Sequence, residues 1–122
     1  MPAAADWREA CRDSDIPGPG DYHIHEDGFG SVIVIRGADL EVRAFANECP
    51  HKRAKFATAG MRGTVRQMTC PLHGWTWALD GTFKALPYGW DRLFDAGRDY
   101  AMAKVAVMLR GGRLFVSRDL SA

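Results

Sequence analysis

The sequence of 122 residues lacks a long apolar run and has only three cysteines. No apolar stretch approaches the roughly 20 residues that a transmembrane helix needs, and the opening residues lack the basic start and apolar stretch of a secretory signal. We therefore expect a cytoplasmic protein without a membrane segment. Three cysteines are an odd count and too few for a disulfide framework, so reduced thiols or metal ligands are the better interpretation.

The chain also has little net charge. Sixteen Lys and Arg stand against fifteen Asp and Glu, which gives a formal net charge of +1. No overall field is available to hold nucleic acid or an anionic bilayer, so we expect neither a nucleic-acid partner nor a membrane partner. Hydrophobic residues make up 47% and charged residues 25% of the chain, which is typical of a folded globular protein.

Short β-branched stretches between glycine-rich turns predict an all-β fold. The expected strands are residues 22–26, 31–36, 41–45, 64–68, 75–79, 82–86, 104–109 and 113–117. Asp80-Gly81 and Gly111-Gly112 are turn signals between neighbouring strands, so hairpins should form there. Helical signals are thin and limited to single turns at 7–11 and 91–94. The length leaves room for one domain, expected to span residues 1–122.

Two short clusters of thiol and imidazole groups carry the chemistry. They are Cys49-Pro50-His51 and Cys70-Pro71-Leu72-His73-Gly74-Trp75, and each supplies one Cys and one His. Two Cys and two His presented from two loops can close around a metal, and the proline in each cluster stiffens its loop. Taken alone, this set of donors also describes a structural zinc site.

This pair of motifs resembles the Rieske-type [2Fe–2S] domain, in which two histidines replace two cysteines on one iron. The resemblance extends to Pro19-Gly20-Asp21-Tyr22, to residues 43–47 and to residues 81–87. Across most of the chain the pattern is similar to the N-terminal Rieske domain of ring-hydroxylating oxygenase large subunits and to their Rieske ferredoxins. That resemblance favours iron and sulfide over zinc.

The resemblance implies a fold, a cofactor and a set of ligands. The fold would be a Rieske-type fold of antiparallel sheets, with a small cluster-binding subdomain formed by two loops at about residues 46–86. The cofactor would be one [2Fe–2S] cluster per chain. Cys49 and Cys70 would bind one iron, and His51 and His73 would bind the other.

The same resemblance implies a role in electron transfer. Ring-hydroxylating oxygenases act at a second iron held by two His and a carboxylate, and only His23 and His25 remain once the cluster has its ligands. We therefore expect a Rieske-type ferredoxin that carries one electron from a reductase to a terminal oxygenase and is not itself an enzyme. Two alternatives stay open: a separately encoded Rieske subunit or domain of a ring-hydroxylating oxygenase complex, and an iron–sulfur redox sensor.

Basic residues gather around the predicted ligands. Residues 49–79 contain five Lys and Arg and no Asp or Glu. Lys52, Arg53 and Lys55 follow His51 closely, so they predict a positive collar that docks an acidic redox partner, with an ordinary solvated loop as the alternative.

Three further residues have weaker signals. His23 and His25 would share one face of a strand, but two histidines alone rarely make a metal site, so we interpret them as surface residues. Cys11 lies outside both clusters and should be either a small buried apolar residue or an idle thiol.

Overall fold

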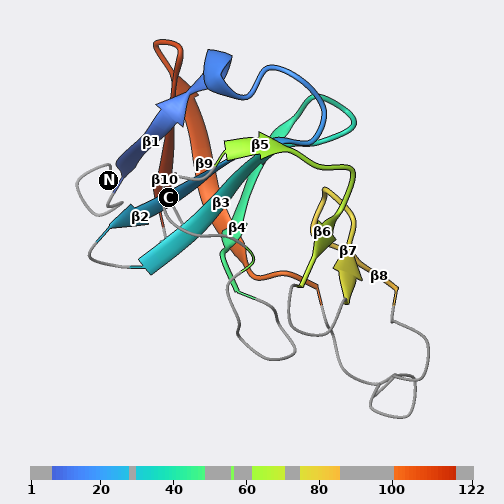
Figure 1. Ribbon diagram of the computed structural model, residues 1–122. Coiled ribbons are helices and arrows are strands. Elements are labelled where there is room, and N and C mark those ends of the chain that lie inside the picture. The colour runs from blue at the N-terminus through green and yellow to red at the C-terminus, as the bar shows by residue number, and fades with distance from the viewer. Residues whose placement is uncertain are drawn as a thin grey trace.

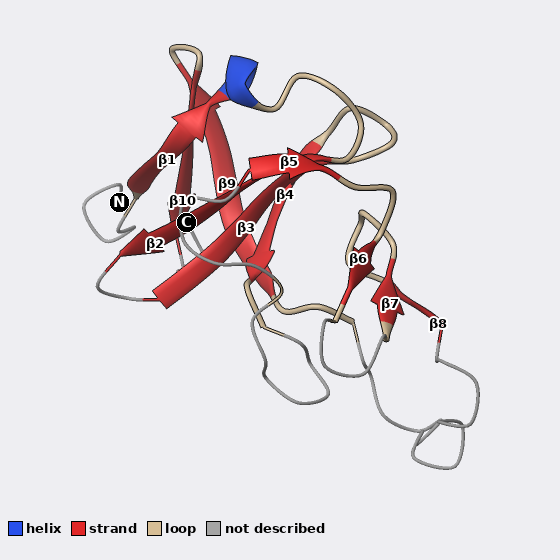
Figure 2. Cartoon of the chain, viewed as in Figure 1, coloured by secondary structure: helices blue, strands red, loops and turns tan. Residues whose placement is uncertain are grey.

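The computed structural model describes residues 7–27, 30–48, 56, 62–70, 75–85 and 101–117. Within these residues it is built from β-strands, with one short 3-10 helix at Asp13–Asp15 (Figures 1 and 2). The predicted all-β class is therefore confirmed. No helix in the described part of the chain is long and apolar enough to cross a membrane.

The strands form two antiparallel sheets. Their bounds are β1 (Arg8–Arg12), β2 (Asp21–Asp27), β3 (Gly30–Arg36), β4 (Val42–Ala46), β5 (Arg62–Thr64), β6 (Met68–Thr69), β7 (Thr76–Trp77), β8 (Phe83–Ala85), β9 (Lys104–Arg110) and β10 (Arg113–Ser117). The larger sheet has the order β1-β10-β9-β4-β3-β2-β5, and the smaller has the order β6-β7-β8. Figure 1 shows the larger sheet curling, with the smaller sheet beside one end of it.

β3 is buried on both faces, which explains why its apolar residues run without alternation. Side chains of successive strand residues point to opposite faces. Val32 and Val34 pack into a core made within the larger sheet, which we call the sheet core. Ile33 and Ile35 pack into a second core between the two sheets, which we call the junction core. All four side chains are at most 3% exposed.

The junction core joins the larger sheet to the smaller one. It is formed by nine buried residues: Ile24, Ile33, Ile35, Phe45, Met68, Cys70, Trp75, Trp77 and Met102. The smaller sheet has only two or three residues per strand, and strands this short do not hold a sheet together by their own hydrogen bonds. Burial of its apolar side chains against β2, β3 and β4 therefore supplies most of its stability.

The three predicted hairpins are present, at β3–β4, β7–β8 and β9–β10. Two local predictions are wrong. Residues 8–12 form strand β1, not a helical turn, because pairing with β10 outweighs the weak local preference for helix. The single strand expected at 64–68 is split, since β5 ends at Thr64 and β6 begins at Met68. The turn expected at 91–94 lies outside the described residues.

Candidate metal centre

Cys70 lies directly after β6, at the point where the second predicted ligand cluster begins. Its side chain is 1% exposed and forms part of the junction core. Its backbone N–H donates a hydrogen bond of 2.8 Å to the carbonyl oxygen of Trp75. The segment that carries His73 therefore leaves and rejoins the described fold at neighbouring points.

Aromatic side chains surround this end of the smaller sheet. Trp75 and Trp77 are fully buried, with ring centroids 6.5 Å apart. Phe83 on β8 packs 5.5 Å from Trp75 and 5.6 Å from Trp77. Trp75 and Trp77 share the junction core with Cys70, and Phe83 packs against that core.

The first predicted ligand cluster is closed at its base by Asn47, the residue after β4. Asn47 is 3% exposed. Its Nδ2 donates to Ser31 Oγ at 2.9 Å, and its backbone N–H donates to the Ser31 carbonyl oxygen at 3.0 Å. Its Oδ1 accepts a hydrogen bond of 3.0 Å from the backbone N–H of Phe56, nine positions further along the chain. Cys49 and His51 lie between these two anchored residues.

The ends of both predicted ligand segments meet in one core. The Phe56 ring packs against the junction core and meets the Trp77 ring edge-on, with centroids 5.5 Å apart and an interplanar angle of 85°. Cys70 and Trp75 belong to the same core. The bases of the two segments are thus largely apolar, and two thiols with two imidazoles are the donor set of a Rieske cluster. The residues present therefore fit a [2Fe–2S] group.

The structure describes one of the four predicted ligands, Cys70. Cys49, His51 and His73 lie outside the described residues, as do the predicted docking residues Lys52, Arg53 and Lys55.

The structure also describes the two remaining histidines and the third cysteine. His23 lies on β2, where it pairs with Val34 on β3 and Arg62 on β5. His25 is 13% exposed at its side chain, with Nε2 2.8 Å from Asp27 Oδ2, so it is more enclosed than the expected surface position. Among the described residues no three or more His, Cys, Asp or Glu side chains gather to hold a metal. Cys11 is 7% exposed and packs in the sheet core, as predicted.

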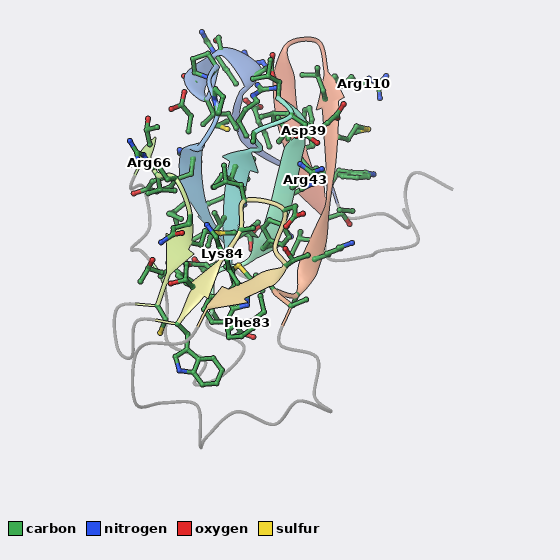
Figure 3. The ribbon with its side chains drawn as sticks, turned by 90° about the vertical axis from the view of Figure 1, so that its right-hand side faces the viewer. Asp39, Arg43, Arg66, Phe83, Lys84 and Arg110 are labelled. Atoms are coloured by element: carbon green, nitrogen blue, oxygen red, sulfur yellow. The ribbon has the colours of Figure 1, made fainter. Side chains whose placement is uncertain are left out.

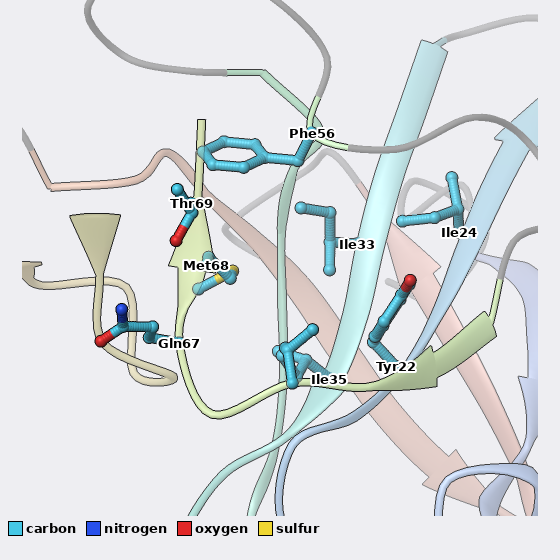
Figure 4. A pocket seen from close by; sticks show the side chains of 9 residues that line it. Tyr22, Ile24, Ile33, Ile35, Phe56, Gln67, Met68 and Thr69 are labelled. Carbon is cyan, nitrogen blue, oxygen red and sulfur yellow. The ribbon is translucent and has the colours of Figure 1, made fainter. Parts of the chain in front are cut away.

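A small apolar pocket lies between the two sheets, and one of its lining residues, Thr69, directly precedes Cys70 (Figure 4). Its volume is about 90 Å³. Ile33 and Ile35 line it from β3, and Met68 and Thr69 line it from β6, with Phe56 at its edge. The pocket marks the seam along which the smaller sheet contacts the larger one.

Charged groups surround the opposite end of the smaller sheet, at the β7–β8 turn. The Thr82 hydroxyl and the Thr82 backbone N–H both donate to Asp80 Oδ1, at 2.7 and 3.0 Å, and these hydrogen bonds lower the pKa of Asp80. Lys84 Nζ donates to Gln67 Oε1 at 3.0 Å. Figure 3 shows Lys84 on the smaller sheet and Arg110 far from it, at the end of β9.

Sequence reasoning missed the residues that brace the two segments, Asn47, Phe56 and Trp77. The available signal was the position of Asn47, a polar residue at the end of a buried strand and two residues before a predicted ligand. An amide at such a place needs buried hydrogen-bond partners.

The comparisons with known proteins agree with this geometry. The profile of the Rieske [2Fe–2S] domain family matches residues 6–90. The chain is 34% identical over 114 residues to the glycine betaine monooxygenase oxygenase subunit of Pseudomonas aeruginosa, covering 92% of this chain and 26% of that protein. It is 33% identical over 121 residues to the carnitine monooxygenase oxygenase subunit of Acinetobacter baumannii, covering 98% of this chain and 32% of that protein.

Solved structures lead to the same family. A structure of naphthalene 1,2-dioxygenase with bound indole superposes with a TM-score of 0.85 and 29% identity, covering 98% of this chain and 27% of that one. A quaternary ammonium Rieske monooxygenase with bound L-carnitine superposes with a TM-score of 0.84 and 30% identity, covering 98% of this chain and 34% of that one. The chain therefore belongs to the Rieske [2Fe–2S] domain family, and a [2Fe–2S] cluster is its cofactor.

These relatives correct two expectations about function. The expectation that the protein is not an enzyme is wrong, because the relatives are oxygenase subunits. This chain spans about a quarter to a third of their length, so its small number of histidines does not separate it from an enzyme. The relatives also favour the alternative, a Rieske domain of an oxygenase complex, over a free ferredoxin.

Proposed function

We propose that this chain is the electron-transfer domain of a Rieske oxygenase subunit. One observation carries the proposal: 98% of the chain superposes on a part of oxygenase chains about three times as long. In this role the chain takes up one electron at a time from a redox protein and passes it to the catalytic part of the oxygenase. The domain boundary 1–122 and the cluster-binding subdomain at about 46–86 belong to the same proposal, and β6–β8 fall within that subdomain.

The proposed ligands are Cys49 and Cys70 on one iron and His51 and His73 on the other. The bound [2Fe–2S] cluster supplies the one-electron redox chemistry. The described residues support this assignment by burying Cys70 in an apolar core and by closing both ligand segments at their bases. Trp75 and Trp77 are buried in the same core as Cys70, and the Phe83 ring packs against both.

The proposed electron donor is an acidic protein that docks near Lys52, Arg53 and Lys55. Support comes from the charge pattern, because residues 49–79 contain five Lys and Arg and no Asp or Glu. Opposite charges on two redox proteins speed their encounter more than they tighten the complex. A cytoplasmic location stays a prediction from the sequence.

Replacing Cys70 tests the ligand assignment, and Cys11 provides a matched control. Both are buried cysteines, but they belong to different cores. In the natural full-length protein, C70A should lose the domain's iron and inorganic sulfide together with the low-g electron paramagnetic resonance signal of the dithionite-reduced cluster. C11A should keep all three. A C70A protein with the iron, sulfide and signal of the unsubstituted protein contradicts the assignment.

Purification from the natural host separates an oxygenase domain from a ferredoxin. A domain of an oxygenase should be recovered in a fixed ratio with the catalytic part, either on the same polypeptide or in the same complex. Recovery as a free carrier that reduces an oxygenase only in transient encounters contradicts the proposal. A partner whose affinity changes with the redox state of the cluster would favour the sensor alternative.

A further inference from the structure

Asn47 uses its whole side chain to join parts of the fold that are far apart in sequence. Its amide nitrogen bonds to Ser31 on β3, and its amide oxygen bonds to the backbone of Phe56. A buried amide is unfavourable unless its polar atoms are paired, whereas an apolar side chain would fill the same volume without that cost. The amide therefore holds the two ends of the 48–55 segment to the sheet, a task that packing alone does not perform.

Phe56 carries the connection on to the smaller sheet. Its backbone N–H is bound to Asn47, and its ring meets Trp77 edge-on at 5.5 Å. Trp77 lies on β7 and pairs in register with Met68 on β6, two residues before Cys70. Asn47, Phe56 and Trp77 thus form a continuous chain of contacts, which we call the bridge, from the base of the first ligand segment to the base of the second.

The two segments are closed in different ways. The second is closed by a backbone hydrogen bond from Cys70 to Trp75, which any side chains at these positions could form. The described bond that closes the first involves a side chain, because its acceptor is the Asn47 amide oxygen. Of these two described closing bonds, only the one at residue 47 can be removed by changing a side chain.

We propose that Asn47 is a positioning residue for the [2Fe–2S] cluster, and that the bridge sets the distance between the segment carrying Cys49 and His51 and the segment carrying Cys70 and His73. The proposal rests on the proposed function and its ligand assignment. Asn47 contacts no metal in this role. It acts through Phe56, by fixing where the first segment ends.

The test compares N47A with two other variants in the natural full-length protein. F56L keeps the backbone N–H that donates a hydrogen bond to Asn47 and removes the ring that contacts Trp77. S117A is the control, because Ser117 is also a buried polar residue, 2% exposed, but lies on β10 and pairs with Ala106 outside the bridge. The readouts are the rate at which an iron chelator removes the cluster and the g values of the reduced protein.

Loss of an outer-shell contact typically weakens metal binding by about 10- to 100-fold. We therefore expect N47A and F56L to lose the cluster about tenfold faster than the unsubstituted protein and to have shifted g values. S117A should lose it at the unsubstituted rate with unchanged g values. If Asn47 had only a structural role, the rate of cluster loss would change to the same extent in all three variants. The g values of the reduced protein would then stay unchanged.

Each other outcome decides against part of the argument. The positioning role is overturned if N47A retains the cluster as S117A does and has the same g values. If N47A does not fold, F56L takes its place, and retention and g values equal to those of S117A overturn the role. A full-length protein without iron and sulfide in this domain overturns the proposed function as well. Equal retention in all proteins that do hold the cluster overturns the bridge alone.

Discussion

Asp39 and Arg43 form an ion pair at the turn that joins β3 to β4. Arg43 Nη1 and Nη2 donate to Asp39 Oδ1 and Oδ2 at 3.0 and 2.8 Å. The Glu41 backbone N–H also donates to Asp39 Oδ1, at 3.0 Å. The Arg43 hydrogen bonds, and after them the bond from Glu41, hold the pKa of Asp39 well below its ordinary value of 3.8. The Asp39 side chain is 51% exposed, so salt screens the pair and its effect on stability is small.

We expect D39N to be slightly less stable than the unsubstituted protein at neutral pH and to approach it in acid. A carboxylate with a depressed folded-state pKa stabilises the fold above its unfolded pKa and loses this contribution as the pH falls through the folded value. Urea unfolding from pH 7 to pH 2 should show the two free energies of unfolding drawing together below about pH 4. A difference that does not change with pH contradicts this account.

Single residues differ in how far their role can be inferred from sequence. The four proposed ligands are inferred because thiols and imidazoles at short spacing have few other uses, and the burial of Cys70 agrees with that inference. The roles of Asn47 and Phe56 cannot be inferred in this way, because an amide and an aromatic ring are common anywhere in a protein. Their roles depend on which backbone group and which ring lie beside them, and tertiary structure alone sets that.

The β7–β8 hairpin is closed against the larger sheet by a glycine that no other residue can replace without strain. Gly81 has φ +89°, a conformation that L side chains rarely adopt. A Cβ at this position would also collide with Cε1 of the Phe45 ring, which is 1% exposed in the junction core. The Met102 backbone N–H donates to the Gly81 carbonyl oxygen at 2.9 Å, so the turn is tied to the chain that leads into β9.

G81A should destabilise the protein more than G112A, its matched control. Gly112 has φ +77°, but apart from its own chain neighbours no atom of the described residues lies within 4 Å of the place its Cβ would occupy. G112A should therefore carry only the backbone cost of about 1–2 kcal/mol. G81A adds a packing clash worth about 1–3 kcal/mol more. Equilibrium urea denaturation measures both, and equal losses would show that Phe45 moves aside without cost.

Among the elements, the hairpins were predicted best. Strands that are very short, or that pair with a strand far away in the sequence, were predicted worst. The β3–β4 and β9–β10 hairpins have β-branched strands and local turns, so their pairing is encoded within a few residues. β1 pairs with β10 from the other end of the sequence, and its residues have no β-branched pattern of their own. β6 has two residues, too few for a periodic signal, and owes its conformation to pairing with β7.

The whole molecule separates its charges along the chain although its net charge is only +1. The proposed docking collar lies in the segment with five bases and no acid, whereas the described ion pairs Asp39–Arg43 and Glu9–Arg113 lie on the larger sheet. If an acidic redox partner docks as proposed, this uneven charge along the chain would favour its approach to the basic segment.

At this scale the motifs predicted the class of protein but not its place in an enzyme. Two Cys-His clusters with Gly74-Trp75 identify the cluster type within a few residues. Whether the carrier is free or is part of an oxygenase depends on surfaces and partners that these motifs do not encode. The prediction of a non-enzyme rested on His23 and His25 being the only histidines left for a second iron. It is wrong, since a domain need not hold the catalytic iron of the enzyme to which it belongs.

The last prediction concerns the docking collar. K52E should slow reduction by an acidic electron donor several-fold at low salt, because it reverses the charge that steers the encounter. R110E is the control: it makes the same change in net charge, but Arg110 lies at the far end of β9, away from the smaller sheet (Figure 3). R110E should leave the rate nearly unchanged, and in molar salt the rates for K52E and the unsubstituted protein should draw together as the Debye length shrinks to about 3 Å. Stopped-flow reduction at a series of salt concentrations measures both effects. Equal slowing by the two variants would mean that overall charge, not a collar beside the cluster, guides the donor.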